Sequence, residues 1–256
     1  MRRAGLLVAA LLGVHADAAP ADDLLAALRR ARTLEARGDV QITVLFPPRT
    51  VPTRTARRLP AVAFMPGLIA RNFTVTGMDG GAVAGRATTR YDLTPKAAGA
   101  ARWALWVDQV WNIPLAYEER TADGGLARRA AFVTVNATPV KVAAQPLSRP
   151  PGLAAAVRRA LPGLSVPPGF EPSGVTGRAD GGLSIALTDG VNVLALVTAP
   201  RNVKAAPGVA SRRVGTGFVW LVGNLPQDAL VTALAGIRGV DPSGLGTFVA
   251  PAASKE

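Results

Sequence analysis

The sequence predicts an α+β protein, in which a curved antiparallel sheet covered by a helix is followed by a smaller α+β C-terminal domain. Three observations support this prediction. An amphipathic helical segment precedes a series of short segments in which apolar and polar residues alternate. Prolines then gather within residues 138–152. Beyond them lie a short helical segment, more strand-like segments and a closing helical segment.

In the first domain, a helix is expected over residues 20–37, because its leucines form an apolar stripe and Gly38 would stop it. A basic, threonine-rich segment at 49–59 is expected to be an exposed hairpin tip or loop. Turns are expected at residues 79–81 and 123–125, which both read Asp-Gly-Gly. The expected strands are 40–44, 71–76, 82–92, 101–109, 115–121 and 127–135.

The proline cluster marks the boundary between the domains, because proline cannot donate to a strand ladder and interrupts helices. We therefore expect a first domain at 19–138, a linker at 139–152, a second domain at 153–249 and a disordered tail at 250–256. The second domain should begin with a helix at 153–161. Pro226 should start its last helix, 227–238, which Gly239 ends. The strands expected between them are 175–178, 183–188, 191–198 and 213–222.

The N-terminal segment has the pattern of a secretory signal peptide. Arg2 and Arg3 precede an apolar segment at 4–14, and Ala16-Asp17-Ala18 matches the small-x-small cleavage rule. We expect a signal peptide at 1–18 and a mature, soluble protein in the periplasm. The alternative is an uncleaved membrane anchor.

The composition excludes several kinds of catalytic site. The chain contains no cysteine, and its single histidine, His15, lies in the expected signal peptide. Cys-His and Ser-His-Asp catalysis and ordinary zinc sites are therefore excluded from the mature chain. Glu118 and Glu119 are adjacent on an expected strand, so they point to opposite faces and cannot act as an acid–base pair. We expect no catalytic residue, no metal site and no cofactor.

The formal net charge of +12 predicts attraction to anionic partners, such as lipid headgroups and lipopolysaccharide. The arginines are scattered rather than gathered in one arm. A genome-wide bias towards arginine is the alternative explanation of the charge. Because the protein is expected to be exported, nucleic acid is not an expected partner.

Short motifs in a particular order carry a resemblance to a known family. Those of the first domain are Val83-Ala84-Gly85-Arg86, Leu93-Thr94-Pro95-Lys96, Arg102-Trp103-Ala104-Leu105-Trp106-Val107-Asp108, Pro114-Leu115, Asp123-Gly124-Gly125 and Ala131-Phe132-Val133-Thr134-Val135. Those of the second are Pro167-Pro168-Gly169-Phe170, Asp189-Gly190 and Val222-Gly223-Asn224-Leu225-Pro226. Their order resembles the RseB/MucB proteins, regulators of an envelope-stress sigma factor.

The resemblance implies a LolA-like half-barrel in the first domain, because that domain of RseB/MucB shares the fold of the lipoprotein carriers LolA and LolB. It also implies two ligands, which are the periplasmic segment of a membrane anti-sigma factor and a lipid or lipopolysaccharide in an apolar cavity. Lipid would release the segment, which is otherwise shielded from a protease. The alternative function is a LolA-like periplasmic carrier of lipoproteins or lipids.

Four apolar residues are the candidates for the wall of the cavity: Phe73, Trp103, Leu105 and Phe132. They occupy positions able to face inward, but alternation alone does not say whether Trp103 or Trp106 is on the inner face. The same residues would otherwise simply fill the core. Arg86 is a candidate for an anion contact, since a guanidinium can hold a carboxylate or phosphate through two hydrogen bonds. The alternative for Arg86 is a structural or solvated role.

Overall fold

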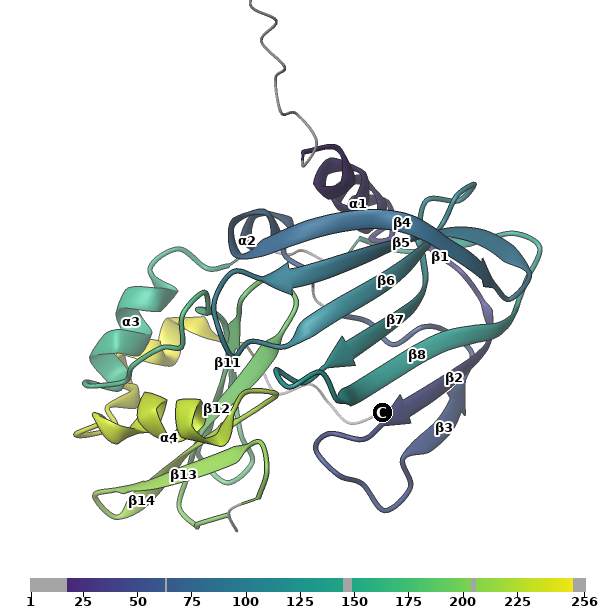
Figure 1. The fold of residues 1–256 in the computed structure, drawn as a ribbon. Coiled ribbons are helices and arrows are strands. Elements are labelled where there is room, and N and C mark those ends of the chain that lie inside the picture. The colour runs from purple at the N-terminus through teal and green to yellow at the C-terminus, as the bar shows by residue number, and fades with distance from the viewer. Residues whose placement is uncertain (1–17, 63, 145–148, 204–205, 251–256) are drawn as a thin grey trace, which may run out of the picture.

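The computed structural model describes residues 18–62, 64–144, 149–203 and 206–250. Among them, the chain forms two large antiparallel-rich sheets, one in each half of the sequence, that lie side by side (Figure 1). The predicted α+β class with a curved, helix-covered sheet is confirmed. The predicted signal peptide, apart from Ala18, and the predicted tail beyond Ala250 lie outside the described residues.

The first half forms a seven-stranded sheet with the order β3-β2-β8-β7-β6-β5-β4, and a separate pair, β1-β9. Strands β4 to β8 follow one another as a meander, as the alternating segments predict. The elements are α1 (Ala18–Arg30), β1 (Leu34–Glu35), β2 (Gly38–Val44), β3 (Thr53–Ala56), α2 (Pro66–Asn72), β4 (Phe73–Val83), β5 (Arg86–Pro95), β6 (Arg102–Asp108), β7 (Pro114–Arg120), β8 (Leu126–Val135) and β9 (Val140–Lys141).

The second half forms a six-stranded sheet with the order β13-β14-β12-β11-β10-β15. Strand β15 returns to pair in parallel with β10, so Ala250, the first residue of the predicted disordered tail, belongs to this sheet instead. The elements are α3 (Leu153–Ala160), β10 (Glu171–Gly177), β11 (Leu183–Thr188), β12 (Val193–Ala199), β13 (Val209–Val214), β14 (Gly217–Val222), α4 (Gln227–Ala235), the 3-10 helix η1 (Pro242–Phe248) and β15 (Val249–Ala250).

The predicted hairpin turn at 79–81 is wrong. Strand β4 continues through these residues, and the register shifts between Asp79 and Ala82, as in a β-bulge. A side chain on Gly80 would meet the Thr88 hydroxyl at 2.6 Å, so the bulge needs glycine there. The turn lies at Ala84-Gly85, where both residues have positive φ, as a tight two-residue hairpin requires.

Other predicted boundaries are also corrected. The first helix ends at Arg30 rather than at residue 37, because Leu34–Glu35 instead pair with β9. That pairing also makes a strand of residues predicted to be linker. The single strand predicted at 213–222 is the hairpin β13–β14, which turns at Gly215. Helix α4 ends at Ala235, three residues before its predicted end. The predicted strand at 71–76 begins at Phe73, because Arg71 and Asn72 end helix α2.

Each sheet has its own apolar core. The leucines of α1 pack on the inner face of the seven-stranded sheet, as their spacing predicts. Helices α3 and α4 pack on the six-stranded sheet. Two residues belong to the core of the other half. Ala100 lies in the second core and Val191 lies in the first. The division into domains at 19–138 and 153–249 remains a prediction.

Candidate functional site

An apolar cavity of about 390 Å³ lies beside helix α1, on the inner side of the seven-stranded sheet. This volume is at the lower end of the range for small-molecule sites. Its residues come from α1, β1, β7, β8, the segment 58–64 and the residues after β9. The apolar side chains that line it include Leu28, Leu34, Leu59, Val62, Phe64, Ile113, Tyr117, Phe132 and Val142.

Charged side chains also lie in the cavity lining. Arg32 and Arg58 are exposed, so they mark its side towards solvent. Glu35 lines the cavity as well and pairs with Arg37 at 2.7 Å. The lining therefore combines an apolar interior with two guanidinium groups at the surface. Such a site can hold an apolar chain and attract an anionic group at its end.

Only one of the four predicted wall residues lines this cavity. Phe132 does so, whereas Phe73, Trp103 and Leu105 are buried in the surrounding core. Trp103 faces inward and Trp106 is half-buried, which settles the open choice of strand face. The role of these residues in binding remains a prediction.

The lining residues Leu59, Val62 and Phe64, and those of β7, are not among the predicted wall residues. The signal for β7 was present, since Leu115, Tyr117 and Glu119 alternate onto one buried face. No comparable signal exists for Leu59, Val62 and Phe64, because an irregular segment has no periodicity that predicts which side chains turn inward.

Trp103 connects the inner wall to the second half of the chain. Its ring lies 5.5 Å from that of Tyr117 and 6.4 Å from that of Phe64, and both of these line the cavity. Its indole Nε1 donates a buried hydrogen bond of 2.7 Å to Oδ1 of Asn192, in the turn between β11 and β12. Asn192 in turn donates to the Ala101 carbonyl and to Oδ2 of Asp189. The cavity wall and the second half of the chain are therefore in contact through Trp103.

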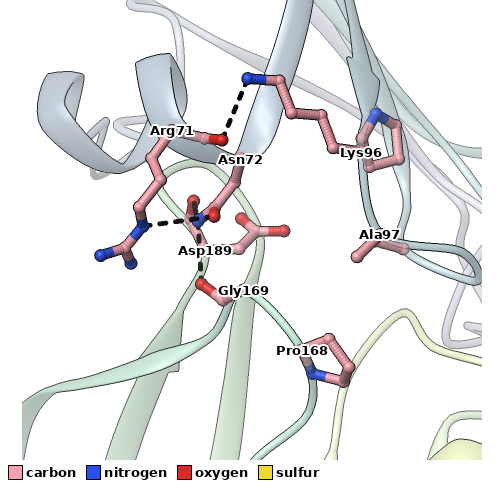
Figure 2. Close-up of a pocket in the computed structure, with 9 residues that line it drawn as sticks. Arg71, Asn72, Lys96, Ala97, Pro168, Gly169 and Asp189 are labelled. Atoms are coloured by element: carbon pink, nitrogen blue, oxygen red, sulfur yellow. Dashed lines mark hydrogen bonds between the residues drawn. The ribbon is translucent and has the colours of Figure 1, made fainter.

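A smaller cavity of about 230 Å³ lies at the joint between the two halves (Figure 2). The amide of Asn72 donates across the joint to the carbonyls of Gly169 and Asp189. Arg71 pairs with Glu171, and Lys96 donates to the carbonyl of Arg71. The polar side chains of this cavity thus already have partners within the chain, so we regard it as part of the domain joint rather than as the ligand site.

Asp189 is the most buried carboxyl at this joint. Burial raises its pKa, although Asn192 and two backbone N–H groups hydrogen-bond to it and act in the opposite direction. A side chain on neighbouring Gly190 would meet the backbone nitrogen of Ile69 at 2.7 Å. The turn therefore packs directly against helix α2. The carbonyl of Asp189 accepts a hydrogen bond from Asn72 at the end of this helix.

Arg86 holds a carboxylate of this chain. Its Nε and a terminal nitrogen donate to Asp108 at 2.6 and 3.0 Å, and its guanidinium lies 3.5 Å from the centre of the Trp111 ring. Asp108 also accepts from the backbone of Val110 and Trp111, as a turn-capping residue does. Burial acts to raise the pKa of Asp108, but these hydrogen bonds outweigh it and the pKa is lowered. This geometry favours the structural alternative for Arg86.

The described residues show no group of three or more histidine, cysteine or acidic side chains that could hold a metal ion. In the same part of the chain, no helix is long and apolar enough to cross a membrane.

No protein-family model and no curated protein matches the chain. Solved structures do. The crystal structure of MucB matches with a TM-score of 0.61 at 18% identity, over 87% of this chain and 98% of that one. The fold is that of MucB. The MucA/MucB complex of Pseudomonas aeruginosa matches with a TM-score of 0.58 at 16% identity, over 88% of this chain and 100% of the matched one. The crystal structure of MucB in complex with MucA(peri) matches with a TM-score of 0.56 at 18% identity, over 86% of this chain and 99% of that one. The MucB-like fold thus includes both halves of the chain.

Proposed function

We propose that this chain is a lipid-sensing regulatory protein of the RseB/MucB type that acts in the periplasm. It binds the periplasmic segment of a membrane anti-sigma factor, and a lipid or lipopolysaccharide acyl chain enters its apolar cavity. The observation that carries the proposal is the match to MucB over both domains, because a minimal LolA-like carrier has only one domain. The complexes of MucB with MucA support the choice of protein partner.

The partner is tested by capture from solubilised envelopes on the immobilised protein. We expect recovery of a single-pass membrane protein through its periplasmic segment, with a cytoplasmic part that binds a sigma factor. Recovery of many acylated lipoproteins, and of no such protein, would support the carrier function instead.

The lipid half of the proposal rests on the cavity of about 390 Å³ and its apolar lining. Burial of a methylene group contributes about 0.8 kcal/mol, so a single acyl chain can bind without a polar anchor. The positive charges at the cavity and the net charge of +12 add attraction for an anionic headgroup. This second contribution should weaken with salt, because exposed charges are screened over about 10 Å at about 0.1 M.

Binding is measured by uptake of a fluorescent fatty acid at low and high salt. Phe132→Arg places a charge in the cavity wall and should abolish uptake, whereas Val133→Arg is the matched control on the same strand. Phe132 is 4% exposed and Val133 is 62% exposed. Ala31→Phe fills the cavity without adding charge and should also reduce uptake. If the wild-type protein takes up neither fatty acid nor lipopolysaccharide at low salt, the lipid half is wrong.

We propose that lipid is coupled to the partner through the position of Trp103. A ligand against Tyr117 and Phe64 displaces the rings that pack on Trp103, which donates to Asn192 of the second domain. Lipid and the protein partner then need only prefer different arrangements of the two domains.

Trp103→Phe tests the coupling, because it keeps an apolar ring and removes the N–H donor. Fatty-acid uptake should persist, while fatty acid should no longer release a bound anti-sigma segment. Trp106→Phe, on the other face of β6, is the matched control and should still release it. Full lipid-driven release from Trp103→Phe would contradict this route.

A further inference from the structure

The hydroxyl of Tyr117 is buried and has no hydrogen-bond partner in the structure. Buried polar groups in proteins almost always have a partner, and a phenylalanine would avoid the cost of burying the hydroxyl. Tyr117 is 1% exposed and belongs to the wall of the 390 Å³ cavity. A ligand that displaces the side chains covering the hydroxyl on the cavity side would bring an oxygen acceptor to it.

The surroundings of Tyr117 explain why the chain itself supplies no acceptor. Its neighbours across the sheet are Leu105 on β6 and Ala130 on β8, both of which are apolar. The ring lies 5.5 Å from that of Trp103, and the guanidinium of Arg128 lies 5.6 Å from its centre. Packing therefore holds the ring in position while its hydroxyl has no partner on the neighbouring strands.

The protonation state of the hydroxyl sets the kind of ligand atom that fits it. Burial raises the pKa of Tyr117, with smaller opposing and reinforcing effects from Arg128 and Glu119. The hydroxyl therefore keeps its proton at neutral pH and offers a donor. The complementary group is an uncharged hydroxyl or carbonyl oxygen, because burying a charged carboxylate in the apolar cavity would cost more.

We propose that Tyr117 determines ligand specificity, by donating a hydrogen bond to an oxygen carried along the acyl chain of the ligand. This inference rests on the proposed lipid function and refines it. The ligand class is then an oxygen-substituted acyl chain, rather than a plain hydrocarbon chain. The small cavity volume favours one such chain at a time.

The test compares dodecanoic acid with a panel of dodecanoic acids that carry one hydroxyl or oxo group at different carbons. Binding is measured by displacement of a fluorescent fatty acid. We expect at least one substituted acid to bind the wild-type protein about tenfold more tightly than the plain acid, as one well-placed buried hydrogen bond allows. Tyr117→Phe should lose this preference and bind the plain acid within about twofold of the wild type.

Tyr91→Phe is the matched control, since Tyr91 is buried in the same core but does not line the cavity. It should keep the preference. The inference is overturned if the wild type binds no substituted acid better than the plain one, or if Tyr117→Phe keeps the preference. In either case, binding of plain dodecanoic acid leaves the proposed lipid function standing. Failure of every acid to bind overturns the inference, and failure of lipopolysaccharide to bind as well overturns the proposed lipid function.

Discussion

The two sheets of this protein cover their apolar faces in different ways. The seven-stranded sheet is covered by helix α1 and the irregular segment 58–64, and a cavity remains at their junction. The six-stranded sheet is covered by α3, α4 and η1. The first core is rich in buried aromatic residues, whereas the buried part of the second core is aliphatic apart from Phe170. The buried aromatic residues of the first core are Phe73, Tyr91, Trp103, Tyr117 and Phe132.

The difference teaches how the cover of a sheet affects whether a cavity remains beneath it. Short helices with small and branched residues interdigitate closely with a sheet, as α3 does through Ala156, Val157 and Ala160. Beneath one helix and an irregular segment, the first sheet instead keeps a cavity lined by side chains such as Leu28, Leu59 and Val62. The cavity of the first half thus depends on the cover of the sheet as much as on the sheet itself.

The largest expected effect is on the first core. Trp103→Ala removes a large buried side chain and should cost about 3–5 kcal/mol of unfolding free energy. Leu194→Ala is the counterpart in the second core and should cost about 2–5 kcal/mol. In calorimetry, each variant should lower a separate thermal transition. Equal shifts of one shared transition would show a single cooperative unit and contradict the division at 139–152.

Asn192→Ala tests the joint between the two cores. It removes the acceptor of Trp103 and the donor to Asp189, and a buried polar group left without a partner costs about 1–3 kcal/mol. Asn224→Ala removes the half-buried hydrogen bond to Glu119, elsewhere on the joint, and should cost about 1 kcal/mol. Urea denaturation measures both. An Asn192→Ala cost no greater than that of Asn224→Ala would mean that the Trp103 contact does not dominate the joint.

The pH dependence of stability should report on Asp189. Because burial raises its pKa, the folded protein binds this proton more tightly than the unfolded chain does. Its contribution therefore favours folding at low pH and is lost as the pH rises through the raised pKa. Relative to Asp189→Asn, the wild type should gain stability as the pH falls from neutral towards about 3.9. Urea denaturation of both proteins across this pH range measures the difference in their unfolding free energies. A difference that stays constant, or that shrinks as the pH falls, would refute the prediction.

The smallest effect is expected from the ion pair on the rim of the joint. Arg71 and Glu171 connect α2 to β10, but Arg71 is more than half exposed. Arg71→Ala should cost about 0–1 kcal/mol, with a loss that shrinks at high salt. Chemical denaturation at two salt concentrations measures it. If Arg71→Ala lost more unfolding free energy than Asn192→Ala, the ion pair would stabilise the contact between the two halves more than the buried hydrogen bonds of Asn192 do.

The sequence by itself determined the fold class, the order of the strands in the meander and the absence of cysteine and histidine chemistry beyond His15. These properties follow from local patterns: alternation for strands, leucine spacing for α1 and composition for chemistry. Alternation placed Trp103 and Leu105 on the same face of a strand, but only the structure shows that this face is the buried one. The sequence prediction was wrong where a turn signal competed with the pairing of two strands. Asp79-Gly80-Gly81 reads as a turn, but the chain turns at Ala84-Gly85, because pairing with β5 continues past the glycines.

Only the tertiary structure decided where the cavity lies and what connects it to the second domain. The cavity is lined by residues from segments far apart in the chain, including the irregular segment 58–64, whose inward side chains follow no period. The bond from Trp103 to Asn192 joins residues 89 positions apart, so no local pattern could indicate it. Tyr117 is predictable as an inward residue, but its unpaired hydroxyl depends on which neighbours the sheet register places around it. Periodicity specifies the face on which a side chain lies, whereas its partners are set by long-range packing.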